Sequence, residues 1–279
     1  MNHKIKSHAK INLALNIIGK ESTLHKIESI IAFIDLYDVI KINFSNSKKH
    51  NITFHGKFSR KIGSSNTISK LLNILEKKKL IKDKKFNINV KKKIPIMAGL
   101  GGGSMNAASI LRFFAKKKII KTTQKELKLI ASLIGSDVIL GLNPVNSILT
   151  KKNELKYFKK CKKFHILLVK PNFGCSSKEI YSKVRRFDKP NFSNLNKNTF
   201  NLMKLKELDN SLEIIVLKKY PTLKKIKLYL ENLSPTFVRL TGSGSALVAY
   251  FQSKERCEIA RKKFNKKYKN YWCIASKTI

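Results

Sequence analysis

A glycine-rich segment near the middle of the chain constrains the fold more than any other feature. Residues 95–109 read Pro-Ile-Met-Ala-Gly-Leu-Gly-Gly-Gly-Ser-Met-Asn-Ala-Ala-Ser, with four glycines in five consecutive positions. Residues 86–90 alternate between apolar and polar side chains as a strand does, and residues 107–114 follow a helical period. Such a loop leaves backbone N–H groups free at the positive end of a helix. The segment therefore predicts a phosphate-binding loop, to which Ser104 and Asn106 could add donors.

Two better-known phosphate loops do not fit this segment. No Lys-Ser or Lys-Thr pair follows the glycines, as a Walker A loop requires. Ser104 stands where the dinucleotide-binding fingerprint needs its third glycine. The remaining alternative is a tight turn that binds no ligand.

Length and composition are those of a globular protein. The 279 residues, of which 42% are hydrophobic, are enough for one large domain or two modest ones. The sequence has neither an apolar run of about 18 residues, which a membrane span needs, nor a signal-peptide core. The four cysteines are far apart and include no Cys-x-x-Cys pair, which argues against a zinc site or a disulfide framework. These features predict a cytoplasmic protein with no membrane partner.

The net charge of +42 suggests nucleic acid as a partner, but the composition of that charge argues against it. Only seven of the 59 basic residues are arginine, and the lysines are spread along the whole chain. Lysine, isoleucine and asparagine are all abundant, and all three have A/T-rich codons. We therefore attribute the charge to base composition and predict no dedicated nucleic-acid partner, although the charge would attract phosphorylated substrates.

The periodicity predicts an α+β fold made of two layers with mixed sheets. A change in character near residue 150 predicts a domain of residues 1–152 and a second domain of residues 153–279, and a turn is expected at 19–23. Strands are expected at 8–18, 27–34, 39–44, 86–91, 165–169, 236–241, 246–251 and 271–275, and helices at 67–79, 104–117, 123–134, 221–233 and 254–268.

The strand at 8–18 carries two candidate functional residues. Alternate apolar residues face the core, so Lys10 and Asn12 share the opposite face, about 7 Å apart along the strand. The alternative is that this face is simply solvated.

A third candidate follows the helix at 123–134. Gly135 is expected to take a left-handed cap, after which Asp137 opens the next segment. Taken alone, an aspartate in this position usually caps a helix.

The pattern Pro-x-x-x-Gly-Leu-Gly-Gly-Gly-Ser-x-Asn-Ala-Ala resembles the phosphate loop of the GHMP small-molecule kinases. Ala-Lys-x-Asn-Leu at 9–13 is similar to the first motif of that family, and residues 239–244 are similar to its third. The resemblance covers essentially the full chain. It implies an N-terminal domain like the second domain of ribosomal protein S5 and a ferredoxin-like C-terminal domain, with the nucleotide in the cleft between them.

The resemblance also implies roles for individual residues. Lys10 and Asp137 would be catalytic. The ATP-binding residues would be Pro95, Ile96, Met97, Ala98, Gly99, Leu100, Gly101, Gly102, Gly103, Ser104, Met105 and Asn106. The substrate-binding residues would be Asn12, His25, Tyr181, Thr241, Gly242, Ser243 and Gly244. The chain departs from the family at Leu24, where relatives have Tyr in a turn that is one residue longer, and at Ile139, where relatives have Pro.

The activity implied by the resemblance is phosphorylation by ATP with Mg²⁺. The acceptor would be the 2-hydroxyl of 4-diphosphocytidyl-2-C-methyl-D-erythritol, in the non-mevalonate route to isoprenoids, and the motifs identify no Mg²⁺ ligands. Two alternatives remain at this point. A homoserine, mevalonate or galactose kinase would share the glycine loop, and a non-catalytic RNA-binding protein with an S5-like fold would account for the charge.

Overall fold

The computed structural model describes residues 3–22 and 24–279, and these form two compact units. Unit 1 comprises Leu36–Ile96 and Gly101–Pro144 together with the N-terminal residues up to Ala9. Unit 2 comprises Lys10–Asp35, Met97–Leu100 and Val145–Ile279. The units therefore do not follow a single boundary near residue 152.

Two long strands explain this division. Strands β1 (His3–Glu21) and β2 (Leu24–Ser45) far exceed the usual strand length of about 3–10 residues, and each contributes residues to both units. The prediction of separate strands at 27–34 and 39–44 was wrong. The acidic residues between them break the apolar pattern but not the strand, because Asp38 is buried with partners. The last residue of the turn expected at 19–23, Thr23, lies outside the described residues.

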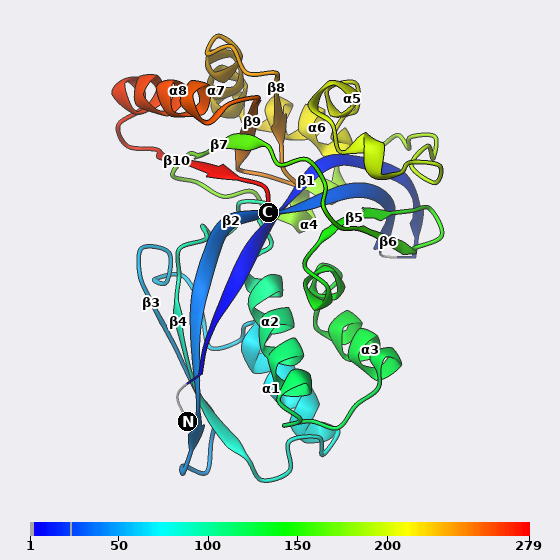
Figure 1. The fold of residues 1–279 in the computed structure, drawn as a ribbon, viewed down its shortest axis with the longest axis vertical. Coiled ribbons are helices and arrows are strands. Elements are labelled where there is room, and N and C mark those ends of the chain that lie inside the picture. Colours follow the sequence, from blue (N-terminus) through cyan, green and yellow to red (C-terminus); the bar gives the residue numbers. More distant parts are fainter. Residues whose placement is uncertain (1–2, 23) are drawn as a thin grey trace. The chain divides into compact units, whose positions relative to one another are not determined.

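In unit 1, a mixed sheet is covered by helices (Figure 1). Strand β3 (Asn51–His55) runs parallel to β4 (Lys85–Lys91), which pairs antiparallel with β2 in the register Ile42 to Ile88. Three helices pack on one another, and a short 3₁₀ helix, η1 (Val138–Leu142), packs against the second and third. These helices are α1 (Thr67–Lys77), α2 (Gly102–Lys116) and α3 (Gln124–Ile134).

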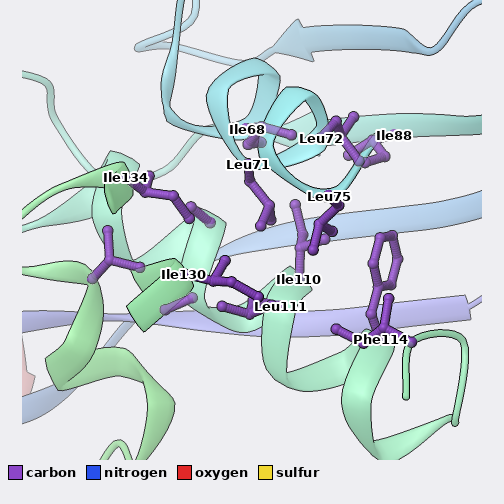
Figure 2. Close-up of a cluster of buried hydrophobic side chains, with 14 of the residues drawn as sticks. Ile68, Leu71, Leu72, Leu75, Ile88, Ile110, Leu111, Phe114, Ile130 and Ile134 are labelled. Carbon is purple, nitrogen blue, oxygen red and sulfur yellow. The ribbon is translucent and has the colours of Figure 1, made fainter. Parts of the chain in front are cut away.

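The three helices meet in a buried apolar core (Figure 2). Their amphipathic patterns supply its side chains, among them Leu71 of α1, Phe114 of α2 and Ile130 of α3. Because the body of α2 is buried along one face, the position of its N-terminal turn in unit 1 is fixed by packing.

Capping residues set the helix boundaries in this unit. Asn66 and Ser69 form a capping box at the start of α1, and Thr123 and Glu126 form another at the start of α3, where the sequence predicts a Ser/Thr start. The expectation of a left-handed cap after α3 was wrong, because Gly135 has φ 172° and is extended.

Unit 2 contains the first part of β2, which pairs with β5 (Asn146–Leu149), itself paired with β6 (Leu155–Phe158). A second, antiparallel sheet has the order β10-β7-β9-β8. Its strands are β7 (His165–Lys170), β8 (Phe237–Leu240), β9 (Leu247–Phe251) and β10 (Trp272–Lys277). Helices α7 (Pro221–Glu231) and α8 (Lys254–Lys267) pack against this sheet (Figure 1).

Four short helical segments complete unit 2. They are α4 (Ser177–Ser182), η2 (Lys197–Thr199), α5 (Leu202–Lys206) and α6 (Ser211–Lys219). The last three, with strands β3, β5 and β6, were not predicted from the sequence, because these stretches are short or polar. The predicted α+β class is confirmed. In the described part of the chain, none of the helices has the length and apolarity needed to span a membrane.

Candidate functional site

In unit 1, the glycine segment opens helix α2. Gly101 is the N-cap, with φ 68°, and it supplies no side-chain cap to the described helix. The first intrahelical bond runs from Met105 N to Gly101 O at 2.8 Å. The N–H groups before Met105 therefore have no partner inside the helix, and they lie at its positive end. This geometry suits an anion.

The start of α1 lies against the same turn. Thr67 Oγ1 donates a 2.7 Å hydrogen bond to Gly103 O. A Cβ added to Gly103 would lie 3.3 Å from Thr67 Oγ1. Thr67 was not among the residues predicted from the sequence. Only its position as the first residue of a helix after an asparagine cap points to it.

In unit 2, residues 97–100 of the glycine segment are bonded to the third motif. Ser245 N donates to Met97 O and Ala246 N donates to Ala98 O, each at 3.2 Å. Thr241 Oγ1 donates to Gly99 O at 3.3 Å. The backbone of this segment is left-handed at two of its residues, with φ 50° at Met97 and 73° at Gly99. Unit 2 thus brings part of the predicted ATP loop against the predicted substrate loop.

The first motif joins the same cluster. Lys10 N donates to Leu100 O at 3.1 Å, and Asn12 N donates to Thr241 Oγ1 at 3.0 Å. The Lys10 ammonium donates to Asn12 Oδ1 at 2.8 Å, while Asn12 Nδ2 donates to Ser29 Oγ at 2.8 Å. Lys10 and Asn12 are each 4% exposed, so the solvated-face alternative was wrong. A buried ammonium oriented by a neighbouring amide is a group prepared to meet negative charge.

The turn of the third motif depends on left-handed glycines and on a distant asparagine. Gly242 and Gly244 have φ values of 54° and 81°. Asn210 Nδ2 donates at 2.8 Å to both Leu240 O and Gly242 O, which holds the two sides of the turn. Ser243 Oγ lies 2.6 Å from Ser177 Oγ at the start of α4. Neither Asn210 nor Ser177 belongs to a sequence motif that would have identified it as a residue of this site.

Asp137 lies in unit 1 at the N-cap position of η1 and is half-buried. Among the described residues its side chain makes no capping bond to that helix. Segment η1 is fixed against α2, since a Cβ on Gly141 would meet the Ala108 side chain, and Arg112 Nη1 donates to Gly141 O at 3.3 Å.

Aromatic rings gather at the remaining predicted substrate residues, in unit 2. The His25 ring centroid lies 5.2 Å from that of Tyr181 and 6.5 Å from that of Phe187. Phe187 is 51% exposed and was not predicted, because it sits in a polar stretch without periodicity. Its neighbour Asp188 anchors that stretch, since Asp188 Oδ2 accepts from Ile17 N at 2.8 Å. Burial, and then the charge of Lys20, lowers the pKa of His25.

The described residues contain no group of three or more His, Cys, Asp or Glu side chains placed to hold a metal ion. Cys161, Cys175, Cys257 and Cys273 are free thiols. Burial raises the pKa of Cys175 to about 11, which leaves that thiol unreactive at neutral pH.

The fold matches solved structures along the whole chain. A structure titled "Crystal structure of 4-(cytidine 5'-diphospho)-2C-methyl-D-erythritol kinase" matches with a TM-score of 0.81 and 21% identity, over 99% of each chain. The homoserine kinase from Cytophaga hutchinsonii ATCC 33406 matches with a TM-score of 0.73 and 15% identity, over 100% of this chain and 94% of that one. Residues 66–144 match the family described as GHMP kinases N terminal domain.

Two sequence relatives share a higher percentage of identical residues with this chain than these solved structures do. The chain is 57% identical over 277 residues to the 4-diphosphocytidyl-2-C-methyl-D-erythritol kinase of Pelagibacter ubique (strain HTCC1062), covering 99% of each protein. It is 32% identical over 297 residues to that of Clostridium tetani (strain Massachusetts / E88), covering 99% of this chain and 100% of the relative. The chain belongs to the GHMP kinase family of small-molecule kinases. Within that family, its sequence similarity is to the 4-diphosphocytidyl-2-C-methyl-D-erythritol kinases.

Proposed function

We propose that this kinase transfers the γ-phosphoryl group of ATP to the 2-hydroxyl of 4-diphosphocytidyl-2-C-methyl-D-erythritol, a step of the non-mevalonate route to isoprenoid precursors. ATP enters as its Mg²⁺ complex, and the products are ADP and the 2-phosphate. The observation that carries the proposal is the 57% identity, along the whole chain, to a protein of that activity. The free thiols and the lack of a membrane-spanning helix among the described residues are compatible with a cytoplasmic reaction.

Phosphoryl transfer needs positioning and charge stabilisation more than covalent help from the protein. In the proposed reaction, Asp137 accepts the proton of the substrate's 2-hydroxyl group, and the oxygen of that hydroxyl group attacks the γ-phosphorus. The bond from that phosphorus to the β,γ-bridging oxygen breaks, and ADP leaves. The buried Lys10 ammonium stabilises negative charge on the transferring group.

The glycine segment holds the phosphates of ATP in this proposal. The N–H groups at the start of α2 are the donors, and the left-handed residues at 97, 99 and 101 set the path of the backbone that presents them. Asn12, beside Lys10, and the 241–244 turn complete the polar surroundings of the substrate.

The cytosine of the substrate is proposed to bind at the aromatic group in unit 2. Tyr181 offers a ring face for stacking, and Phe187 offers a second one from a different segment. Leu24, where relatives have Tyr, is 72% exposed and provides only apolar area. His25 binds the hydrogen-bonding edge of the base.

The proposal is tested by incubating the purified chain with ATP, Mg²⁺ and the cytidyl substrate. Formation of the 2-phosphate, followed by phosphorus NMR together with ADP release, supports it. Homoserine and mevalonate are the comparison substrates, because kinases for both share this fold. Turnover of either one without turnover of the cytidyl substrate would contradict the proposal.

Removing the Tyr181 ring should weaken binding of the cytidyl substrate specifically. Base–aromatic stacking is worth about 1–3 kcal/mol, so we expect Tyr181→Ala to raise KM for that substrate by about 5- to 140-fold. Phe187→Ala should raise it less, because the Phe187 ring lies farther from His25. KM for ATP should stay unchanged in both variants. Tyr157→Ala, which removes an exposed tyrosine on β6, is the control. Equal increases for both substrates would indicate a folding defect.

The His25 pKa predicts how substrate binding depends on pH. Since this pKa is lowered from 6.5, the imidazole is neutral at pH 7 and has one donor and one acceptor for the base edge. Protonation removes the acceptor. KM for the cytidyl substrate should therefore be flat from pH 8 to 7 and rise only as the pH falls below 6.5. In His25→Gln, whose side chain does not titrate, the rise should disappear. A rise that persists in this variant would assign the titration to another group.

A further inference from the structure

A carboxylate outside the motifs lies at the centre of a buried network in unit 1. Asp38, on β2, is 0% exposed and has four hydrogen-bond donors. Its Oδ1 accepts from Lys93 N at 2.7 Å and from Ile94 N at 2.9 Å. Its Oδ2 accepts from the Lys92 ammonium and, at 3.1 Å, from Asn106 Nδ2. These donors come from the segment directly before the glycine loop and from the last residue of the loop, Asn106.

The donors lie at the two ends of that loop. Ile94 directly precedes Pro95, the first residue predicted for ATP, and Asn106 is the last. One carboxylate therefore bonds both the entry and the exit of the loop. The Asn106 side chain is 2% exposed, and its Oδ1 accepts no hydrogen bond from the described residues. Its amide is thus oriented by Asp38, and its donor is directed to that carboxylate.

The network also places a positive charge beside the first residue of α2. Lys92 is 3% exposed, and a Cβ on Gly102 would lie 3.4 Å from its ammonium nitrogen. A buried ammonium is costly without a partner, and Asp38 is that partner. The backbone of Lys92 is fixed as well, because its N–H donates to His55 O on β3 at 2.8 Å. The ammonium is therefore held where a helix dipole already favours anions.

We propose that Asp38 is a positioning residue for ATP binding. It holds the two ends of the 95–106 loop in the geometry that binds phosphate, and it orients the Lys92 ammonium toward the first turn of α2. Asp38 itself touches no substrate. The proposal rests on the proposed function only in that ATP binds this loop; it does not depend on the identity of the phosphate acceptor.

The test compares Asp38→Asn with a matched ion-pair variant in the same unit. The asparagine oxygen still accepts from the backbone N–H groups, while the charge facing Lys92 and the acceptor for Asn106 are lost. We expect KM for ATP, and the dissociation constant of a non-hydrolysable ATP analogue measured by calorimetry, to rise by about 10-fold or more. KM for the cytidyl substrate should change by less than about 2-fold. Glu76→Gln, which removes the partner of Lys85, should leave ATP binding unchanged.

A purely structural role for Asp38 gives a different pattern. In that case Asp38→Asn and Glu76→Gln would both lower the melting temperature. Each variant, once folded, would bind the ATP analogue with wild-type affinity, and this result would overturn the proposal. If the Asp38→Asn variant does not fold, the Asn106→Ala variant is used in its place. This substitution removes the hydrogen bond between Asn106 and Asp38 and keeps the ion pair between Lys92 and Asp38. It should weaken analogue binding by about 3-fold or more, and unchanged binding would overturn the proposal.

The same experiment separates this inference from the proposed function. Wild-type protein that binds the ATP analogue but does not phosphorylate the cytidyl substrate refutes the proposed acceptor and leaves the Asp38 comparison decisive. Wild-type protein that binds no analogue overturns both.

Discussion

The Asp137→Asn variant is expected to bind ATP with wild-type affinity and to lose kcat by about 100-fold or more, which is the scale of general base catalysis. Asparagine has nearly the same shape as aspartate but accepts no proton at neutral pH. Steady-state kinetics, with ATP affinity measured by calorimetry, checks both parts.

Asp83→Asn is the control for this variant, because Asp83 is an exposed aspartate in a turn of the same unit. It should leave kcat unchanged. If Asp137→Asn retains near wild-type kcat, Asp137 is not the general base. If it loses ATP binding together with kcat, its role is in nucleotide binding.

The Gly99→Ala variant should weaken ATP binding by about 100-fold or more, since small displacements of a binding group can have effects of this size. Gly99 has φ 73°, which is unfavourable for alanine, and a Cβ there would overlap the carbonyl oxygen of Thr241. Either the loop or the third motif must therefore move. Calorimetric titration with ATP measures the loss.

Gly63→Ala is the matched control, because no atom lies within 4 Å of a Cβ at that position. It should bind ATP like the wild type. Thermal melting of both variants shows whether the Gly99 substitution acts on the loop or on the whole fold. Wild-type affinity in a folded Gly99→Ala protein would mean that this loop does not hold the nucleotide.

Local signals in the sequence determined much of the fold. The Ser/Thr start at Thr123 and the apolar stripes of α1, α2 and α3 predicted those helices nearly to their ends, because caps and periodicity act over a few residues. The same locality explains the errors. The unbroken β2, for example, depends on its pairing with β4 and β5, which lie far away in the chain.

The motifs determined the family and its expected site residues, because glycines at fixed spacing indicate a backbone conformation that other residues rarely adopt. Only the tertiary structure decided which residues support them. Asn12 meets Thr241 across 229 positions of sequence, and Asp38 reaches Asn106 across 68. Asn210 and Phe187 belong to stretches with no periodicity. Their positions follow from the pairing of strands and the closing of loops. A hydrogen bond between residues so far apart in the chain leaves no recognisable pattern in the sequence around either residue.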